Sequence, residues 1–203
     1  MATRFILIRH GQTEWNRGAE RFRGRADVLL NATGQQQAQQ LTAFLAHEKM
    51  DALYVSPMQR TLQTAQPLAA VHKLIAQPHP ALLDIDFGEL EGLTQEEARA
   101  AFPEIMVQWE NAPGTVKFPN GESLRAVRAR IVGLLDELAD KHAAETVTLV
   151  SHRVVCGAML CVALGLPLSA QWRIKQDLAC LNLFERRDSD YVVTLLNCTA
   201  HLI

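Results

Sequence analysis

The chain has 203 residues, of which 48% are hydrophobic and 21% are charged, and its formal net charge is −2. This composition is ordinary for a globular protein, and the length suits a single α/β domain over residues 1–203. The near-neutral charge argues against nucleic acid or an anionic membrane as a partner. No apolar run reaches the length of a transmembrane helix.

The four cysteines predict free thiols rather than a metal site or a disulfide framework. They form no Cys-x-x-Cys pair and no spacing typical of zinc ligands. Three of them fall in apolar stretches, so buried thiols are expected. The N-terminus lacks the apolar core and cleavage site of a signal peptide. We therefore expect a reducing, cytoplasmic setting for Cys156, Cys161, Cys180 and Cys198.

The first part of the chain alternates strand-like and helix-like segments. It begins with an apolar run typical of a strand buried on both faces, and helical spacing follows. Ser56 and Pro57 are typical of an N-cap and of the first position in a helix, so a second helix is predicted to start there. The expected strands are 5–8 and 52–55, and the expected helices are 33–49 and 56–72.

The same alternation continues to the end of the chain. Leu82 and Leu83 suggest a third strand, and Thr94 with Glu97 forms a capping box that opens a short helix. Alternating β and α units predict a three-layer α/β/α sandwich with a mainly parallel central sheet. The remaining expected elements are a long amphipathic helix over 123–142, a strand over 146–150, an apolar helix ending at 164, and two closing strands over 182–184 and 191–196.

Side chains that can bind a ligand or take part in catalysis follow the predicted strands. His10 comes just after the first strand, Arg60 lies one helical turn after the second, Asp84 follows the third and His152 the fourth. Ligands bind beyond the carboxyl ends of strands in open α/β sheets, so these side chains are expected to meet at one edge. Each alone has an ordinary structural explanation, such as a hydrogen-bonding histidine or a turn-forming aspartate. Their shared position favours a site.

This set of side chains suits phosphoryl transfer. Guanidinium forks and helix N-termini bind phosphate oxygens. A neutral imidazole is a nucleophile, and nearby positive charge disfavours its protonation. Phosphoryl transfer needs mainly positioning and charge stabilisation, which arginines supply without Mg²⁺. A carboxylic acid is still required to protonate the leaving oxygen and then to activate water.

The chain resembles the histidine phosphatase superfamily, the phosphoglycerate mutase-like proteins, along nearly its whole length. The resemblance implies that Arg9, Asn16 and Arg60 bind phosphate, that His10 is the phosphorylated nucleophile, that His152 is the second pocket histidine and that Asp84 is the general acid. The most specific matching segments are Leu7-Ile8-Arg9-His10-Gly11-Gln12-Thr13-Glu14-Trp15-Asn16 and Ser56-Pro57-Met58-Gln59-Arg60-Thr61-Leu62-Gln63-Thr64-Ala65, and residues 24–38, 88–92, 121–123 and 150–152 follow in the family's order.

Three positions depart from the family pattern. Asp84 stands where the family acid is commonly Glu, so Glu89 and Asp86 remain rivals for that role. Arg153 follows His152 where the family usually has Gly; it either adds a cation facing the substrate or points harmlessly along the helix. Asn31 replaces a common Thr before the helix over 33–49, and either residue caps a helix.

Phosphatase is the first functional hypothesis. The alternatives are a phosphoglycerate mutase that depends on a cofactor and a non-catalytic phospho-ligand binder on the same fold. The resemblance implies that mutases of this family are longer chains, with an added segment and a C-terminal tail that closes over the site. No His-x-His or His-Glu-x-x-His motif occurs, so no metal and no resident cofactor are expected.

The expected substrate is a small-molecule phosphate monoester. Phosphosugars, phosphoglycerate, α-ribazole phosphate and phosphoproteins are the candidates that the family implies. The stretches 21–25 and 102–118 either shape specificity or are a solvated loop and a plain helical hairpin, and the oligomeric state is open.

Overall fold

The computed structural model describes residues 2–188 and 190–202 and contains one mixed sheet. The strand order is β3-β2-β4-β1-β5-β6. The first four strands in this order run parallel, and β5 and β6 are antiparallel to their neighbours. The strands are β1 (Thr3–Arg9), β2 (Ala52–Val55), β3 (Ala76–Pro78), β4 (Thr146–Ser151), β5 (Leu181–Arg187) and β6 (Asp190–Cys198).

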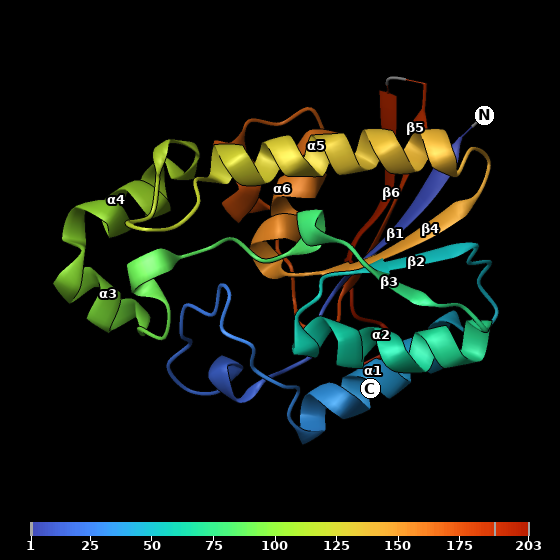
Figure 1. Cartoon of the computed structure of the whole chain (residues 1–203), viewed down its shortest axis with the longest axis horizontal. Helices are drawn as coiled ribbons and strands as arrows, with labels where there is room; N and C mark the ends of the chain where they lie inside the picture. The colour runs from blue at the N-terminus through green and yellow to red at the C-terminus, as the bar shows by residue number, and fades with distance from the viewer. Residues whose placement is uncertain (1, 189, 203) are drawn as a thin grey trace.

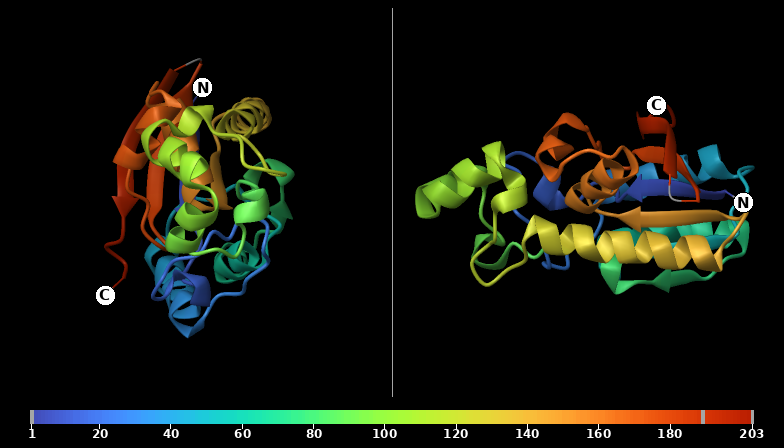
Figure 2. Two further views of the ribbon diagram at one scale, coloured as in Figure 1. Left: turned by 90° about the vertical axis from the view of Figure 1, so that its left-hand side faces the viewer. Right: turned by 90° about the horizontal axis from the view of Figure 1, so that it is seen from above.

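Helices cover both faces of the sheet (Figures 1 and 2). α1 (Ala32–Leu45) and α2 (Gln59–His72) lie on one face, while α5 (Leu124–Lys141) and α6 (Arg153–Ala163) lie on the other. The short helices α3 (Gln95–Ala101) and α4 (Pro103–Asn111) project beyond one end of the sheet. The predicted three-layer α/β/α sandwich with a mainly parallel sheet is therefore confirmed.

The central position of strand β1 explains why its sequence is apolar at every residue from Phe5 to Ile8. Ile6 and Ile8 pack into the core beneath α1 and α2. Phe5 and Leu7 pack into the other core, against α5 and α6. All four side chains are fully buried. A central parallel strand has helices on both sides, so each alternate residue meets a hydrophobic layer.

Several helix boundaries agree with the predicted caps. Ser123 caps α5 by accepting a hydrogen bond from the Ala126 N–H, and Thr94 and Glu97 form the predicted capping box of α3. Asn31 caps α1 by accepting from the Gly34 N–H. Each cap satisfies an N–H that the first helical turn leaves without an intrahelical partner.

The predicted third strand was wrong. Ala81 and Leu82 lie in a 3-10 turn, η2 (Pro80–Leu82), and the strand is β3, which ends before this turn at Pro78. Pro80 fixes the first position of this turn, and the His79 side chain accepts from the Ala81 N–H. Leu82 is buried because the turn packs it into the core, not because it belongs to the sheet.

The predicted start of α2 was also too early. The helix begins at Gln59 with Met58 in the N-cap position and no side-chain cap. The Ser56 hydroxyl is within 2.8 Å of His152 instead, so it is committed to a contact between elements. α1 likewise ends at Leu45, four residues before the predicted end. None of the helices in the described ranges is long and apolar enough to cross a membrane.

Candidate active site

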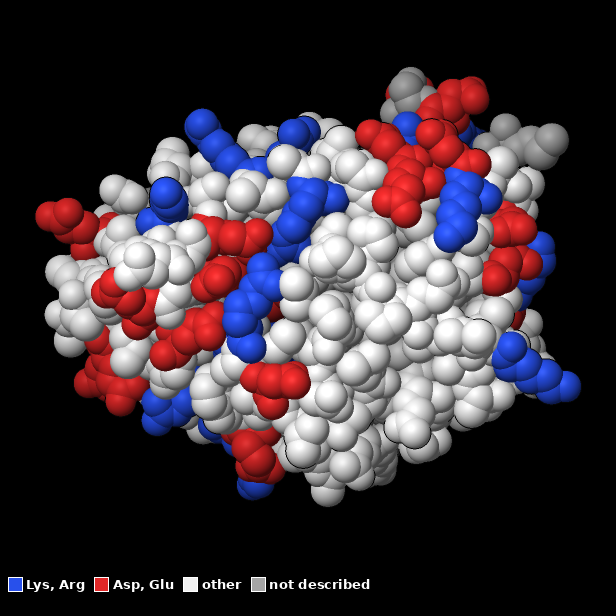
Figure 3. Space-filling model, viewed as in Figure 1, with Lys and Arg blue, Asp and Glu red and all other residues white. Residues whose placement is uncertain are grey.

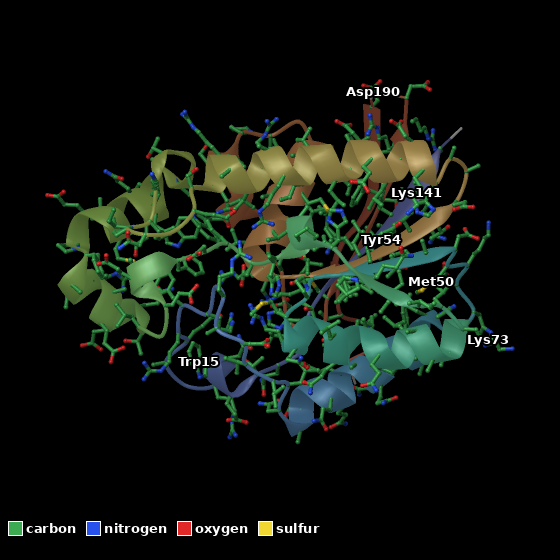
Figure 4. The ribbon with its side chains drawn as sticks, in the orientation of Figure 1. Trp15, Met50, Tyr54, Lys73, Lys141 and Asp190 are labelled. Atoms are coloured by element: carbon green, nitrogen blue, oxygen red, sulfur yellow. The ribbon has the colours of Figure 1, made fainter. Side chains whose placement is uncertain are left out.

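The predicted site residues come together at the carboxyl ends of the parallel strands. His10 follows β1, Arg60 lies in the first turn of α2 after β2, and His152 follows β4. Asp84 reaches the same place from the segment after η2, although no strand precedes it directly. All four are buried. In Figure 4, Met50 and Lys73 mark the opposite end of the sheet, and Trp15 lies in the segment after β1, on the side of the site.

His10 has a defined tautomer, and its Nε2 has no hydrogen-bond partner among residues 2–188 and 190–202. Its Nδ1 lies 2.7 Å from the Gly11 carbonyl oxygen, and a carbonyl only accepts, so the proton resides on Nδ1. Nε2 therefore keeps its lone pair. Burial, followed by the charges of Arg60 and Arg9, lowers the pKa of His10 well below its ordinary value. The ring is thus neutral, with Nε2 available as a nucleophile.

Arg60 connects His152 to the carboxylate of Asp84. Its Nε donates to Nδ1 of His152 over 3.1 Å, and its Nη2 is 3.3 Å from Asp84 Oδ2. Its terminal nitrogens also donate to the carbonyls of Ala26 and Gly24, over 2.8 and 2.9 Å. These contacts fix a fully buried guanidinium in one orientation, which a lysine does not reproduce.

His152 is also held as a neutral imidazole. Because its Nδ1 accepts from Arg60, its Nε2 carries the proton and donates to the Ser56 hydroxyl over 2.8 Å. Burial, and then the charge of Arg60, lowers the pKa of His152 well below its ordinary value. Its ring centroid is 5.4 Å from that of His10. Both ring nitrogens bond within the protein, so contact with a phosphate would replace one of these bonds.

Three arginines share the carboxylate of Glu20. The nearest is Arg23, whose Nη2 is 3.0 Å from Oε1; Arg153 Nη1 is 3.5 Å from Oε2 and Arg9 Nη2 is 4.0 Å from Oε1. The Asn16 amide donates to Oε1 over 3.4 Å, which places Asn16 beside Arg9 and the other arginines. Burial raises the pKa of Glu20, but the three arginines outweigh it and hold this pKa below its ordinary value.

Two of the arginines around Glu20 have N–H donors without a partner among the described residues. Within residues 2–188 and 190–202, the buried Nε atoms of Arg9 and Arg23 have no hydrogen-bond partner. Burial and the charge of Arg23 lower the pKa of Arg9 to about 10, so Arg9 remains a cation at neutral pH. Buried donors of this kind normally find partners. They therefore suit an anionic ligand such as phosphate.

Close backbone packing holds the loops that carry these side chains. A Cβ on Gly11 would lie 2.7 Å from the Gly34 carbonyl oxygen, so the loop after β1 packs directly against the start of α1. Gly24 has a φ of +46°, and a Cβ there would lie 2.0 Å from Glu91 Oε1. Gly24 thereby presents its carbonyl to Arg60 from a left-handed turn that favours glycine.

A pocket of about 330 Å³ opens beside these groups. Its volume is at the lower end of the range for small-molecule sites. Figure 3 shows Lys and Arg side chains in a band between the acidic region over α3 and α4 and a largely uncharged region over the centre. The pocket is lined by Glu20, Arg21, Phe22, Arg23, Asp84, Phe87, Gln95, Trp109, Glu110, Arg153, Val154 and Trp172.

Comparison with known proteins identifies the family that carries this arrangement. The model of the histidine phosphatase superfamily (branch 1) matches residues 5–199. The chain belongs to the histidine phosphatase superfamily.

Similar proteins of this superfamily agree in length and fold. Phosphoserine phosphatase 1 of Hydrogenobacter thermophilus is 36% identical over 199 residues, which are 98% of this chain and 94% of that protein. Bacillus stearothermophilus YhfR superposes with a TM-score of 0.93 at 27% identity, over 99% of this chain and 100% of YhfR. A mutant phosphoserine phosphatase from Entamoeba histolytica in complex with phosphoserine gives 0.89 at 27% identity, over 99% and 100%.

These relatives confirm the resemblance that the sequence carries. They also support the prediction that the chain is a phosphoric monoester hydrolase. Asp84 alone of the three carboxylates weighed for the acid lines the pocket. Glu89 is exposed and accepts from Asn120, and Asp86 accepts from the Gly88 N–H inside a turn.

Sequence reasoning missed two members of this histidine phosphatase site and misread a third. Glu20 carries no motif, and its position among the arginines depends on how the loop folds back. Arg23 belongs to the stretch 21–25, which was interpreted either as a specificity loop or as a solvated loop. Ser56 was read as a helix cap but bonds His152. Among the described residues, no group of three His, Cys, Asp or Glu side chains is placed to hold a metal ion.

Proposed function

We propose that this protein is a metal-independent phosphatase that hydrolyses phosphate monoesters through a phosphohistidine intermediate on His10. The observation that carries the proposal is the state of His10: Nδ1 is bonded to the Gly11 carbonyl, the pKa is lowered, and Nε2 is free. A neutral, oriented imidazole beside a cluster of arginines is what attack on phosphorus requires.

The first half-reaction forms a bond between Nε2 of His10 and phosphorus and breaks the bond from phosphorus to the ester oxygen. Arg9, Asn16 and Arg60 bind the phosphoryl oxygens and stabilise the charge that builds on them. Asp84 gives its proton to the departing ester oxygen, so the leaving group departs as an alcohol. The position of Asp84 on the pocket wall supports this role.

The second half-reaction returns the enzyme to its starting state. Asp84, now a carboxylate, takes a proton from water as the water oxygen bonds to phosphorus. The bond from phosphorus to Nε2 breaks, and inorganic phosphate leaves. His152 holds Arg60 through its Nδ1, and its Nε2–H exchanges the Ser56 hydroxyl for a phosphoryl oxygen during transfer. Residues 1–203 act as one domain in this scheme.

The substrate in this proposal is a small phosphate monoester. Phosphoserine is the first candidate, because two similar proteins are named as phosphoserine phosphatases. A cytoplasmic setting is part of the same proposal. It is supported by four free cysteines, of which Cys156 is buried and has a pKa raised well above its ordinary value by burial. A buried thiol of this kind does not react readily as a nucleophile or with oxidants.

One experiment tests the nucleophile. We expect rapid quenching with ³²P-labelled substrate to trap an acid-labile, base-stable phosphoenzyme in the parent and none in His10→Ala. Turnover by His10→Ala should fall below about 1% of the parent rate, as for loss of a nucleophile. Exposed His47→Ala is the matched control. A trapped phosphoenzyme in His10→Ala, or turnover near the parent rate, would refute the mechanism.

The same preparation tests independence from metal. Activity should survive EDTA followed by gel filtration, because the cations in the pocket are guanidinium groups. Vanadate or tungstate should inhibit, since each mimics a phosphoryl group in transfer. Activity that vanishes after chelation and returns with added Mg²⁺ or Zn²⁺ contradicts the metal-independent part of the proposal.

A further inference from the structure

Arg153 lies at the entrance to the site, in the first turn of α6 directly after His152. It lines the same pocket as Asp84, on the side where the leaving group must lie if Asp84 is the acid. A cation near a helix N-terminus is unfavourable, because the helix dipole places partial positive charge there. Helix stability therefore does not account for an arginine at this position.

Aromatic side chains hold the Arg153 guanidinium over the pocket. Its Cζ lies 5.8 Å from the Trp172 ring centroid, within the range of a cation–π contact. Trp172 is fixed in turn, because its Nε1 donates to the Trp109 carbonyl over 2.9 Å and its ring packs edge-on against Trp109, with centroids 4.8 Å apart. The contact with Trp172 involves the face of the Arg153 guanidinium and none of its N–H donors.

The donors of Arg153 are mostly uncommitted. Its one ion pair among the described residues is the 3.5 Å contact with Glu20, and its side chain is 48% exposed. By contrast, Arg21 is paired with Glu97 at 3.2 Å, and Glu110 is paired with Arg99 at 2.6 Å. These other charges on the pocket wall have partners of their own. Arg153 instead shares a carboxylate that lies closer to Arg23.

Glu20 shows which kind of group this position accepts. One carboxylate spans from Arg153 to Arg9, which the proposed function assigns to the phosphate. A ligand with its phosphoryl group at Arg9 therefore needs only a few bonds to bring a second anionic group to Arg153. The bridging group in the protein is itself a carboxylate, the anion that a guanidinium fork matches in size and geometry.

We propose that Arg153 is a specificity-determining residue that binds a carboxylate on the leaving group of the substrate. This inference rests on the proposed function and narrows its substrate to small phosphate monoesters that also carry a carboxylate. It also chooses between the two orientations that the sequence left open for Arg153: the side chain faces the substrate.

The test uses two pairs of substrates that differ in the carboxylate. 3-Phosphoglycerate is compared with glycerol 3-phosphate, and O-phosphoserine with O-phosphoethanolamine. kcat/KM is measured for each in the parent, Arg153→Gln and Arg153→Lys, with Arg128→Gln as a control that removes one exposed charge on α5. For a compound that is hydrolysed too slowly, its Ki against p-nitrophenyl phosphate supplies the ratio.

In the parent, we expect the carboxylate-bearing member of each pair to be favoured. Arg153→Gln should reduce that preference by about tenfold or more, mainly through KM, as for the loss of a charge-assisted hydrogen bond used in ground-state binding. Arg153→Lys should restore it in part, because the charge remains and the fork is lost. Arg128→Gln should keep the parent ratio.

Two outcomes overturn the inference about Arg153 and leave the proposed phosphatase function intact. One is a parent with no preference for the carboxylate; the other is an Arg153→Gln variant that loses the same factor on both members of each pair. Thermal melting shows whether each variant is folded, and a poorly folded Arg153→Gln leaves Arg153→Lys to decide. A parent inactive on every ester, p-nitrophenyl phosphate included, refutes the proposed function itself.

Discussion

The assignment of Asp84 as the general acid is the part of the proposed mechanism that most needs a test. It has one methylene fewer than the glutamate that the family commonly uses, yet it is buried, lines the pocket and lies 3.3 Å from Arg60 and 3.7 Å from His152. Glu89 is exposed and bonded to Asn120. Geometry therefore favours Asp84 as the group nearest to the leaving oxygen.

Leaving-group dependence separates the two carboxylates. Asp84→Asn should lose far more rate on alkyl phosphates than on p-nitrophenyl phosphate, because nitrophenolate leaves without a proton and an alkoxide does not. General acid catalysis typically contributes about 10²–10⁴-fold, so a selective loss of that order is expected. Steady-state rates on both ester classes measure it.

Glu89→Gln is the matched control and should show no such selectivity. On p-nitrophenyl phosphate, breakdown of the phosphoenzyme should become limiting in Asp84→Asn, since the same residue is proposed to activate water. A burst of nitrophenol in that variant would reveal this step. If the selective loss appears instead in Glu89→Gln, the acid is Glu89 and Asp84 is structural.

Single residues of the site differ in how far the sequence reveals them. His10, Arg60 and His152 were predictable because each lies a fixed short distance after a buried strand, and the sheet brings those points together. Glu20 and Arg23 were not, because their positions depend on hydrogen bonds such as that from Arg23 to the Trp15 carbonyl. The tautomers of both histidines also required partners that no local pattern encodes.

At the scale of elements, strong local signals located most helices and central strands. Two of the failures have physical causes that the structure shows. β3 is a short edge strand that pairs with β2 alone and carries Pro78, so it lacks the apolar run of a buried strand. Ser56 has the chemistry of an N-cap, but its hydroxyl faces His152 and the helix starts three residues later. A tertiary contact there outweighs local preference.

The cap of α5 gives a prediction about stability. Ser123 accepts from the Ala126 N–H over 3.2 Å at the start of an 18-residue helix that packs across one face of the sheet. Ser123→Ala should lower the free energy of unfolding by about 1 kcal/mol, the usual cost of losing an N-cap. Urea unfolding measures the loss. Ser123→Asn is the control and should retain most of the stability, because an asparagine oxygen also caps.

One outcome would contradict the predicted contribution of the Ser123 cap. If Ser123→Ala and Ser123→Asn unfold at the same urea concentration as the parent, the cap contributes nothing and α5 is stabilised by packing alone. That packing is extensive, with Val127, Ile131, Leu134, Leu135 and Leu138 buried in the core.

At the scale of the whole molecule, the fold buries two uncharged imidazoles among arginines in order to build the site. Protonating either His10 or His152 in the folded protein would place a further positive charge beside Arg60 without solvent to screen it. The site and the stability of the protein are therefore linked through pH. This linkage is measurable without any knowledge of the substrate.

The sign of the effect follows from the two pKa values. In the unfolded chain each histidine titrates near 6.5, whereas in the folded protein the pKa of His10 and His152 is well below that value. Above pH 6.5 neither state binds these protons, and stability does not depend on them. Below it, only the unfolded chain takes them up, so the free energy of unfolding falls as pH decreases.

We therefore expect urea unfolding between pH 7.5 and 5 to show a loss of stability that steepens below pH 6.5. Each imidazole contributes a limiting slope of about 1.4 kcal/mol per pH unit. In His10→Gln, whose side chain does not titrate, the slope below pH 6.5 should be smaller than in the parent by about that amount. His47→Gln, at an exposed position, should keep the parent slope. Equal slopes for His10→Gln and the parent would show that His10 is protonated as readily in the folded protein as in the unfolded chain, and the neutral nucleophile would have to be abandoned.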